Sequence, residues 1–144
     1  MAIEPIYVVD TNALIWHLSD DRRLGRTAAA VFAAAERGET RLILSAVVIA
    51  ELYYADRKFG IFSDFAAVFR RLQQAPHFRL MAFEAEDVLR FTEDEAVPEM
   101  HDRIIAGLAR ALEAPLLTSD ARIASADEGV RPRHQRGDRG LSTG

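Results

Sequence analysis

Short apolar runs alternate with amphipathic segments along most of the chain. The runs are too short for helices, are rich in leucine and β-branched residues, and predict strands at residues 6–9, 41–44, 78–83 and 115–118. The segments between them carry apolar positions at helical spacing and predict helices at residues 13–18, 25–37, 46–59, 62–74, 84–91 and 99–114. Strands that alternate with helices are joined by right-handed crossovers, so the pattern predicts an α/β fold with a parallel sheet.

The pattern is less regular at two places. Residues 92–98 predict an acidic loop, and residues 121–125 predict a short helical turn. A weak fifth strand could begin at Val130, although Pro132 opposes it. We therefore predict a single domain at residues 1–130 and a basic, disordered tail at residues 131–144.

The first apolar run, Ile6–Val9, ends abruptly at Asp10. A continuous apolar run is typical of a strand that is buried on both faces, so we expect it in the centre of the sheet. Thr11 or Asn12 then caps the following helix. Chemistry in open α/β sheets collects beyond the carboxyl ends of strands, which is where Asp10 is expected. A second interpretation stays open, in which Asp10 only caps this helix.

The predicted order of the strands places a second acid near the first. If the second and third strands lie on one side of the first strand and the fourth lies on the other, the connections reverse between the first and fourth strands. Ligands bind at such a switch point in open α/β sheets. Asp10 and Asp120 would then flank one crevice, because Asp120 follows the fourth strand. Asp120 would also suit a helix cap.

The composition narrows the chemistry. The 144 residues include no cysteine, so a metal ion would be held by oxygen or imidazole rather than by thiolate. The net charge is −4, and because the four Arg and one Asp of residues 131–144 contribute +3, the body carries −7. An acidic body argues against nucleic-acid binding unless its acids surround a metal ion. Residues 1–4 lack the features of a signal peptide and no apolar run reaches membrane length, so we expect a cytoplasmic protein without a membrane partner.

Glu51 is predicted on an apolar helix face. On a helical wheel it lies between Val47 and Val48 one turn before it and Tyr54 and Ala55 one turn after it. An unpaired carboxylate in that position is costly, so it needs a cation or a proton. Pairing with a buried arginine is the alternative to metal binding.

Asp102 shows a similar pattern. It shares a helix face with Ile105 and Ala109, and it also lies in the first turn, where the helix dipole favours an acid. Capping and dipole effects explain each acid singly, but they explain less well four acids from four separate elements, namely Asp10, Glu51, Asp102 and Asp120. Convergent oxygen ligands without sulfur are typical of Mg²⁺ or Mn²⁺ sites.

Four separated motifs then carry a resemblance to a known family. They are VDTNALIW at 9–16, SAVVIAE at 45–51, PEMHDRII at 98–105 and LTSD at 117–120. Over residues 5 to about 125 the chain resembles the PIN domain, in particular VapC-type toxins. The resemblance implies a PIN-like three-layer sandwich, with a parallel sheet of four to five strands in the order 3-2-1-4-5 flanked by helices. It also implies a Mg²⁺- or Mn²⁺-dependent endoribonuclease that a cognate antitoxin neutralises.

The resemblance also implies which residues act. The four acids of the family correspond to Asp10, Glu51, Asp102 and Asp120, and its flanking hydroxyl positions correspond to Thr11 and Thr118. The three aspartates are predicted metal ligands, while Glu51 binds through water or serves as the general base. The two threonines orient water or carboxylates around the ion. His101 is interpreted as a surface or packing residue, because neighbours on a helix face different ways.

Two other functions stay open. A catalytically silent PIN-fold binding module would keep the fold without nuclease activity. An aspartyl-phosphate phosphotransfer domain also places an acid after its first strand, but such domains use a lysine near the site. The only lysine here is Lys58, which lies far along a predicted helix.

Surface residues suggest partners. Trp16, Ile49 and Tyr53 are predicted opposite the buried helix faces, and with the resemblance they indicate a groove for the antitoxin or a homodimer face. Arginines of a polar turn, together with those of the tail, are candidates for contacting RNA phosphates. The turn residues are Arg22, Arg23 and Arg26. The alternative is that the turn and the tail are only solvated.

Overall fold

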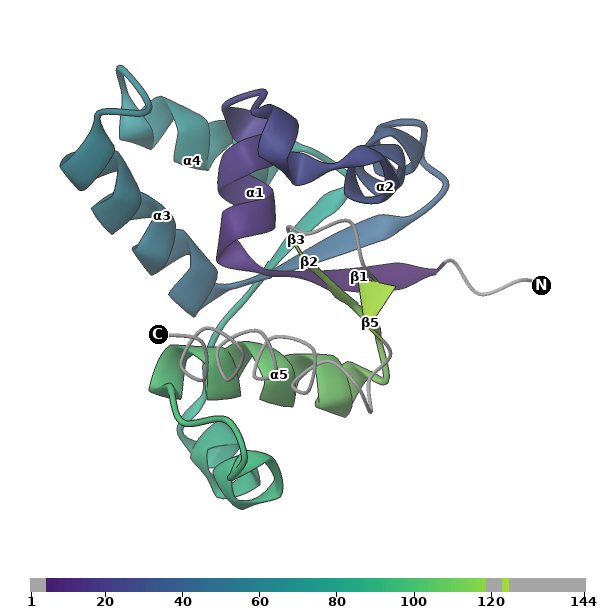
Figure 1. The fold of residues 1–144 in the computed structure, drawn as a ribbon, viewed down its shortest axis with the longest axis vertical. Coiled ribbons are helices and arrows are strands. Elements are labelled where there is room, and N and C mark those ends of the chain that lie inside the picture. Colours follow the sequence, from purple (N-terminus) through teal and green to yellow (C-terminus); the bar gives the residue numbers. More distant parts are fainter. Residues whose placement is uncertain (1–4, 119–122, 125–144) are drawn as a thin grey trace, which may run out of the picture.

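The computed structural model describes residues 5–118 and 123–124. Its elements in chain order are β1 (Ile6–Val9), α1 (Thr11–Leu18), η1 (Arg22–Leu24), α2 (Arg26–Glu36), β2 (Arg41–Ser45), α3 (Ala46–Phe59), α4 (Phe65–Gln74), β3 (Phe78–Met81), η2 (Ala85–Asp94), α5 (Met100–Leu112), β4 (Leu116–Leu117) and β5 (Ile123–Ala124). Figure 1 shows α1 to α4 on one side of a central sheet and α5 on the other. The predicted three-layer α/β fold is confirmed.

The sheet has the strand order β3-β2-β1-β4-β5. β1 pairs in parallel with β2 and with β4, and β2 pairs in parallel with β3. Val9 lies opposite Leu117 in the β1–β4 ladder. The parallel order 3-2-1-4 is therefore confirmed, and the switch point lies between β1 and β4 as predicted.

The end of the sheet differs from the prediction. β5 occupies residues 123–124, where a helical turn was predicted, and it runs antiparallel to β4. A two-residue strand is defined by its pairing with β4 rather than by its own sequence pattern, so no local signal marks it. The strand predicted from Val130 and the tail predicted at residues 131–144 lie outside the described residues.

The core is formed by the strands and the helix faces that cover them. The large side chains with almost no exposed surface are Val8, Val9, Leu14, Phe32, Leu42, Leu44, Val48, Leu52, Ile105, Leu116 and Leu117. They come from β1, β2 and β4 and from helices on both sides of the sheet, so burial of apolar surface fixes both layers against the strands. None of the helices in the described part of the chain is long and apolar enough to span a membrane.

Helix boundaries follow the capping residues, with corrections at two helix starts. α4 begins at Phe65 after an Asp64 cap, not at residue 62. Ser45 Oγ accepts a hydrogen bond from the N–H of Val47 at 3.2 Å, and Gly60 ends α3 in the left-handed conformation with φ 63°. α1, however, begins at Thr11 and is capped by Asp10, not by Thr11 or Asn12. The aspartate takes the cap because it is in extended conformation directly before the first helical residue.

The segment between β3 and α5 is a further correction. A helix at 84–91 and an acidic loop at 92–98 were predicted, but η2 forms 3₁₀ turns from Ala85 to Asp94. Glu84 and Asp87 form a capping box that starts these turns. Asp94 is buried and paired with Arg110 of α5, so this acid is held against a helix rather than in a solvated loop.

Candidate active site

Asp10 lies at the carboxyl end of β1, at the switch point of the sheet. Its Oδ1 accepts a hydrogen bond from the N–H of Ala13 at 3.0 Å, and its own N–H donates to the carbonyl of Leu117 at 3.0 Å. The residue is only 1 % exposed. Asp10 is therefore a helix cap, as the alternative interpretation held, but it is also a buried acid beside the end of β4.

Thr118 follows β4, the strand that pairs with β1, and corresponds to Asp10 in the strand register. Since Val9 lies opposite Leu117 in a parallel ladder, the next position on each strand is Asp10 and Thr118. Thr118 is buried like Asp10. The strand register therefore leads to adjacent backbone positions for a carboxylate residue and a hydroxyl residue at this edge.

Glu51 is held from both sides. Thr11 Oγ1, from the first residue of α1, donates a hydrogen bond to Glu51 Oε1. His101 Nδ1, from the first turn of α5, lies 3.0 Å from Glu51 Oε2. Glu51 thus joins the N-terminal ends of α1 and α5, which are far apart in sequence.

The environment of Glu51 differs from the helical-wheel prediction. Val48 and Leu52 are buried, but Tyr54 is 71 % exposed, and the Glu51 side chain retains 27 % of its surface. Glu51 therefore lies at the margin of the buried face and not at its centre. No arginine pairs with it in the described part of the chain; its cationic neighbour there is His101 when the ring is protonated.

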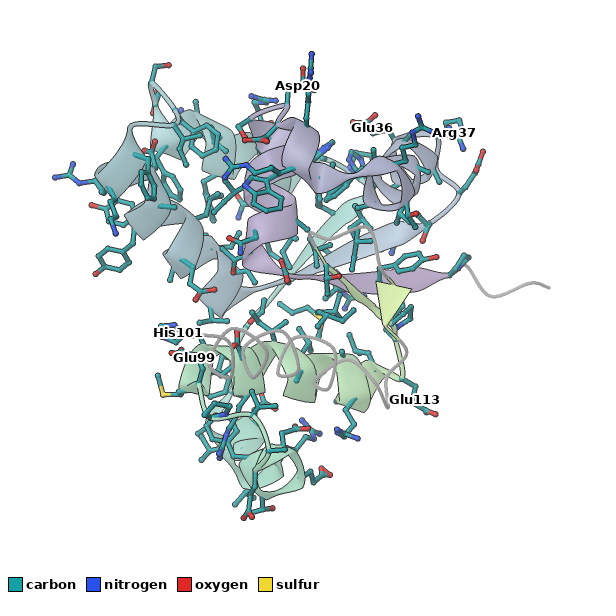
Figure 2. All side chains as sticks on the ribbon, viewed as in Figure 1. Asp20, Glu36, Arg37, Glu99, His101 and Glu113 are labelled. Atoms are coloured by element: carbon teal, nitrogen blue, oxygen red, sulfur yellow. The ribbon has the colours of Figure 1, made fainter. Side chains whose placement is uncertain are left out.

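α5 lies on the other side of the sheet, but its N-terminal end brings Asp102 to the same edge as Glu51. Glu99 caps this helix by accepting from the N–H of His101 at 3.2 Å, and Asp102 lies in the first turn, half-buried. The helix packs against β1 and α3, while Ile105 and Ala109 are buried below Asp102. Figure 2 shows Glu99 and His101 together at one end of α5, with Glu113 at the other end.

The structure brings together only part of the predicted set. It places Asp10 beside Thr118, and Thr11 beside Glu51, whereas Asp120 lies outside the described residues. Within residues 5–118, no three carboxylate or imidazole side chains are grouped closely enough to hold a metal ion. The available donors are all oxygens or imidazole, which suits a hydrated Mg²⁺ or Mn²⁺ held by one or two carboxylates but not an ion caged entirely by these residues.

Sequence reasoning missed His101 and two arginines of the same helix. Arg103 donates to the carbonyls of Val97 and Glu95, the latter at 3.2 Å, and Arg110 Nη2 lies 2.7 Å from Asp94 Oδ1. Both arginines fasten the end of η2 and the segment after it to α5. The PEMHDR motif includes His101 and Arg103, but no local pattern shows what either residue touches.

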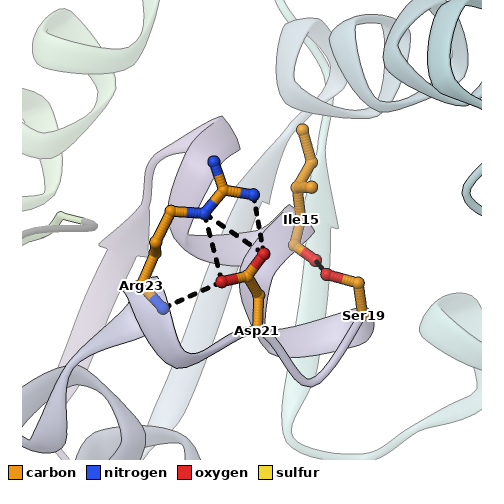
Figure 3. Close-up of polar contacts among 4 residues, drawn as sticks. All are labelled: Ile15, Ser19, Asp21 and Arg23. Atoms are coloured by element: carbon orange, nitrogen blue, oxygen red, sulfur yellow. Dashed lines mark hydrogen bonds and ion pairs between the residues drawn. The ribbon is translucent and has the colours of Figure 1, made fainter.

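The predicted surface residues need correction. Trp16 and Ile49 are half-buried and pack against the core, so they are not exposed anchors, whereas Tyr53 is 40 % exposed. The Arg23 guanidinium lies 4.8 Å from the centre of the Trp16 ring. It also donates hydrogen bonds to the Asp21 carboxylate, the shortest at 2.7 Å (Figure 3). These hydrogen bonds hold the pKa of Asp21 at about 2. Arg23 is thus occupied within its own turn.

Comparison with known proteins fits this geometry. The family model of the PIN domain matches residues 7–129. A chain in the crystal structure of VapBC2 from Rickettsia felis bound to a DNA fragment from their promoter superposes with a TM-score of 0.55 and 18 % sequence identity, covering 77 % of this chain and 84 % of that chain. None of the curated proteins matches significantly. The match to the family model spans most of the chain and shows that the chain belongs to the PIN domain family.

Proposed function

We propose that this protein is a Mg²⁺- or Mn²⁺-dependent endoribonuclease and the VapC-type toxin of a toxin–antitoxin pair. The observation that carries the proposal is the buried carboxylate of Asp10 at the switch point between β1 and β4, beside the end of a strand that leads to Asp120. Membership of the PIN domain family and the fold shared with a VapBC2 chain support it.

Each acid has a proposed role. Asp10, Asp102 and Asp120 would hold the divalent ion, which when bound lowers the pKa of a water molecule and offsets the charge that develops on the phosphate. Glu51 is oriented by Thr11 and serves as the base that accepts a proton from the attacking water. Thr118, buried beside Asp10, orients a carboxylate or a water molecule at the same edge.

The arrangement disfavours an aspartyl-phosphate mechanism. Such a mechanism needs a lysine close to the phosphorylated carboxylate. Lys58 lies seven residues after Glu51 on α3, or about 10 Å further along the helix axis, with its Nζ 5.3 Å from the centre of the Phe59 ring. Lys58 therefore lies away from the carboxyl edge of the sheet, where a lysine of such a mechanism would have to be.

RNA cleavage tests the proposal directly. The purified protein is incubated with a labelled single-stranded RNA in Mn²⁺ or in chelator, and Asp10→Asn is assayed in parallel. We expect cleavage only with metal and only by the wild type, because the amide keeps the hydrogen bond to Ala13 but loses the ligand charge. Cleavage by Asp10→Asn at the wild-type rate would overturn the assignment of the site. Binding of RNA without cleavage under all conditions would instead indicate a silent PIN-fold module.

Exposed aromatic residues of α3 are the proposed antitoxin surface. Tyr53, Tyr54 and Phe59 are 40 %, 71 % and 69 % exposed, and the Tyr53 ring packs edge-on against both Tyr54 and Phe65. Large exposed aromatics in contact with one another are typical of protein interfaces. We expect expression of the protein to arrest growth, co-expression with its cognate antitoxin to relieve the arrest, and Tyr54→Ser to weaken that relief. Unimpaired relief in this variant would remove α3 from the interface.

A homodimer in the cytoplasm completes the proposal. Val88 and Leu89 of η2 and Met100 of α5 are exposed apolar residues separate from the α3 aromatics, which leaves a second surface for self-association. Sedimentation of the wild type and of Leu89→Ser tests the dimer, which the variant should weaken.

Arg22 and Arg26 are exposed next to α1 and are the candidate phosphate contacts of the described turn.

A further inference from the structure

Glu51 is the meeting point of three helix N-terminal regions. One of its oxygens accepts from Thr11, forty residues away at the start of α1, and the other lies 3.0 Å from His101 Nδ1, fifty residues away at the start of α5. Glu51 itself belongs to the second turn of α3. No feature of the local sequence requires these contacts, so they result from how the helices pack.

The contact fixes the role of the His101 ring. A carboxylate can only accept hydrogen bonds, so the hydrogen of this contact lies on Nδ1. The same Nδ1 is 3.4 Å from Glu99 Oε1, which already accepts from the backbone N–H of His101. His101 is therefore held between two carboxylates, with the shorter contact to Glu51. Its side chain keeps 43 % of its surface exposed.

We propose that His101 is a positioning residue for Glu51: its Nδ1–H and the Thr11 hydroxyl hold the two carboxylate oxygens in one orientation. A glutamate side chain has three rotatable bonds, and at the margin of the core packing alone restrains it weakly. Two donors from two different helices fix the plane of the carboxylate. The catalytic consequence of this positioning rests on the proposed endoribonuclease function, whereas the hydrogen bond between His101 and Glu51 can be tested without it.

Substitutions of His101 separate positioning from direct catalysis. The side-chain amide nitrogen of Asn lies one bond beyond Cγ, as Nδ1 does, so His101→Asn can keep the donor to Glu51. The amide of His101→Gln lies one bond further out, near the place of Nε2, and His101→Ala has no donor. A direct catalytic role for the exposed ring nitrogen predicts that all three variants fail, whereas positioning predicts that Asn alone succeeds.

The kinetic experiment measures kcat and KM for RNA cleavage in Mn²⁺ by the wild type and these variants. We expect Ala and Gln to lose about 10- to 100-fold in kcat with little change in KM, which is the usual cost of removing a group that orients a catalytic side chain. His101→Asn should stay within a few-fold of the wild type. His77→Ala, which removes a histidine that follows α4, is the matched control and should leave kcat unchanged. Equal loss in Asn and Ala would overturn the proposal.

A spectroscopic measurement separates this proposal from the proposed function. In protein labelled with ¹⁵N-histidine, NMR should show a slowly exchanging Nδ1–H for His101, which disappears or shifts in Glu51→Gln but persists in Asp10→Asn. An unchanged signal in Glu51→Gln would overturn the contact itself. If the wild type shows this signal but cleaves no RNA, the endoribonuclease function is contradicted. The hydrogen bond of His101 would then be structural only, and its positioning role in catalysis would also be overturned.

Discussion

The buried pair of Asp94 and Arg110 allows a prediction with a worked magnitude. The Asp94 side chain is 1 % exposed, and Arg110 Nη2 lies 2.7 Å from its Oδ1. Substituting Arg110→Met keeps the length of the side chain but leaves a buried carboxylate without its cation. Loss of one partner of a buried ion pair costs about 3 to 5 kcal/mol. Because Arg110 is 32 % exposed, water can partly replace it, and we expect the free energy of unfolding to fall by about 3 kcal/mol.

The double variant Asp94→Leu with Arg110→Met tests the reasoning. Asp94 Oδ2 and Arg110 Nε are buried and lack a hydrogen-bond partner among the described residues, so the pair is incompletely satisfied. Replacing such a pair by apolar side chains of similar size is often neutral or stabilising. The double variant should therefore unfold within about 1 kcal/mol of the wild type, well above the single variant.

Urea unfolding followed by fluorescence of Trp16, the only tryptophan, measures these differences. Arg90→Met is the matched control, because Arg90 pairs with Asp87 at 2.9 Å on the surface of the same segment, with both side chains at least one third exposed. A surface pair of this kind contributes about 0 to 1 kcal/mol. Equal effects of Arg110→Met and Arg90→Met, or a double variant no more stable than Arg110→Met, would refute the account of a costly buried carboxylate.

Three further predictions concern metal, pH and packing. Mn²⁺ at a hundredfold excess over Kd should stabilise the folded protein by about 2.7 kcal/mol, raising Tm, and Asp10→Asn should lose most of this rise if Asp10 is a ligand. Burial lowers the pKa of His17, which stacks on Phe32. The contribution of His17 to stability is therefore present above the unfolded pKa of 6.5 and is lost as the pH falls through the lower folded value. The free energy of unfolding of His17→Gln, measured across this pH range, should fall less than that of the wild type. Gly107→Ala should raise the free energy of unfolding by about 0.5 to 1 kcal/mol, because it replaces a glycine in the helix interior and its Cβ would meet Asp94 Oδ2 only at 4.0 Å. A destabilised variant would show that α5 is packed too tightly there.

Local sequence signals sufficed where one pattern had one structural solution. The run Ile6–Val9 predicted a central strand, and β1 does lie between β2 and β4, with Val8 and Val9 fully buried and Ile6 and Tyr7 partly buried. That position places Asp10 at the carboxyl edge of the sheet. The limits of α3 followed from a serine cap and from Gly60 in the left-handed conformation. The parallel order of four strands followed from alternation with helices and from the family resemblance.

Tertiary contacts decided what the sequence left undetermined. α3 carries apolar residues around most of its circumference, so the helical wheel placed Tyr54 in the buried stripe although Leu52 is the buried residue. β5 exists because β4 offers an unpaired edge, and the position of His101 depends on how α5 packs against α3. The assignment of Asp10, Glu51, Asp102 and Asp120 to one metal site stays a prediction, since Asp120 lies outside the described residues.

The arrangement of helix ends bears on how an acidic protein could carry out the proposed cleavage of RNA. In a parallel α/β sheet the helices begin where the strands end, so α1 and α3 direct their N-terminal ends toward the carboxyl edge that carries Asp10. Asp10, Ser45 and Glu99 each accept a backbone N–H at the start of a helix. The partial positive charge of a helix N-terminus stabilises a carboxylate and attracts a phosphate equally well. In the proposed function, a net charge of −4 would therefore not decide the potential at this edge, because helix ends and a bound divalent ion would act locally on a phosphate. Distant surface acids would act on the same phosphate only through screening solvent.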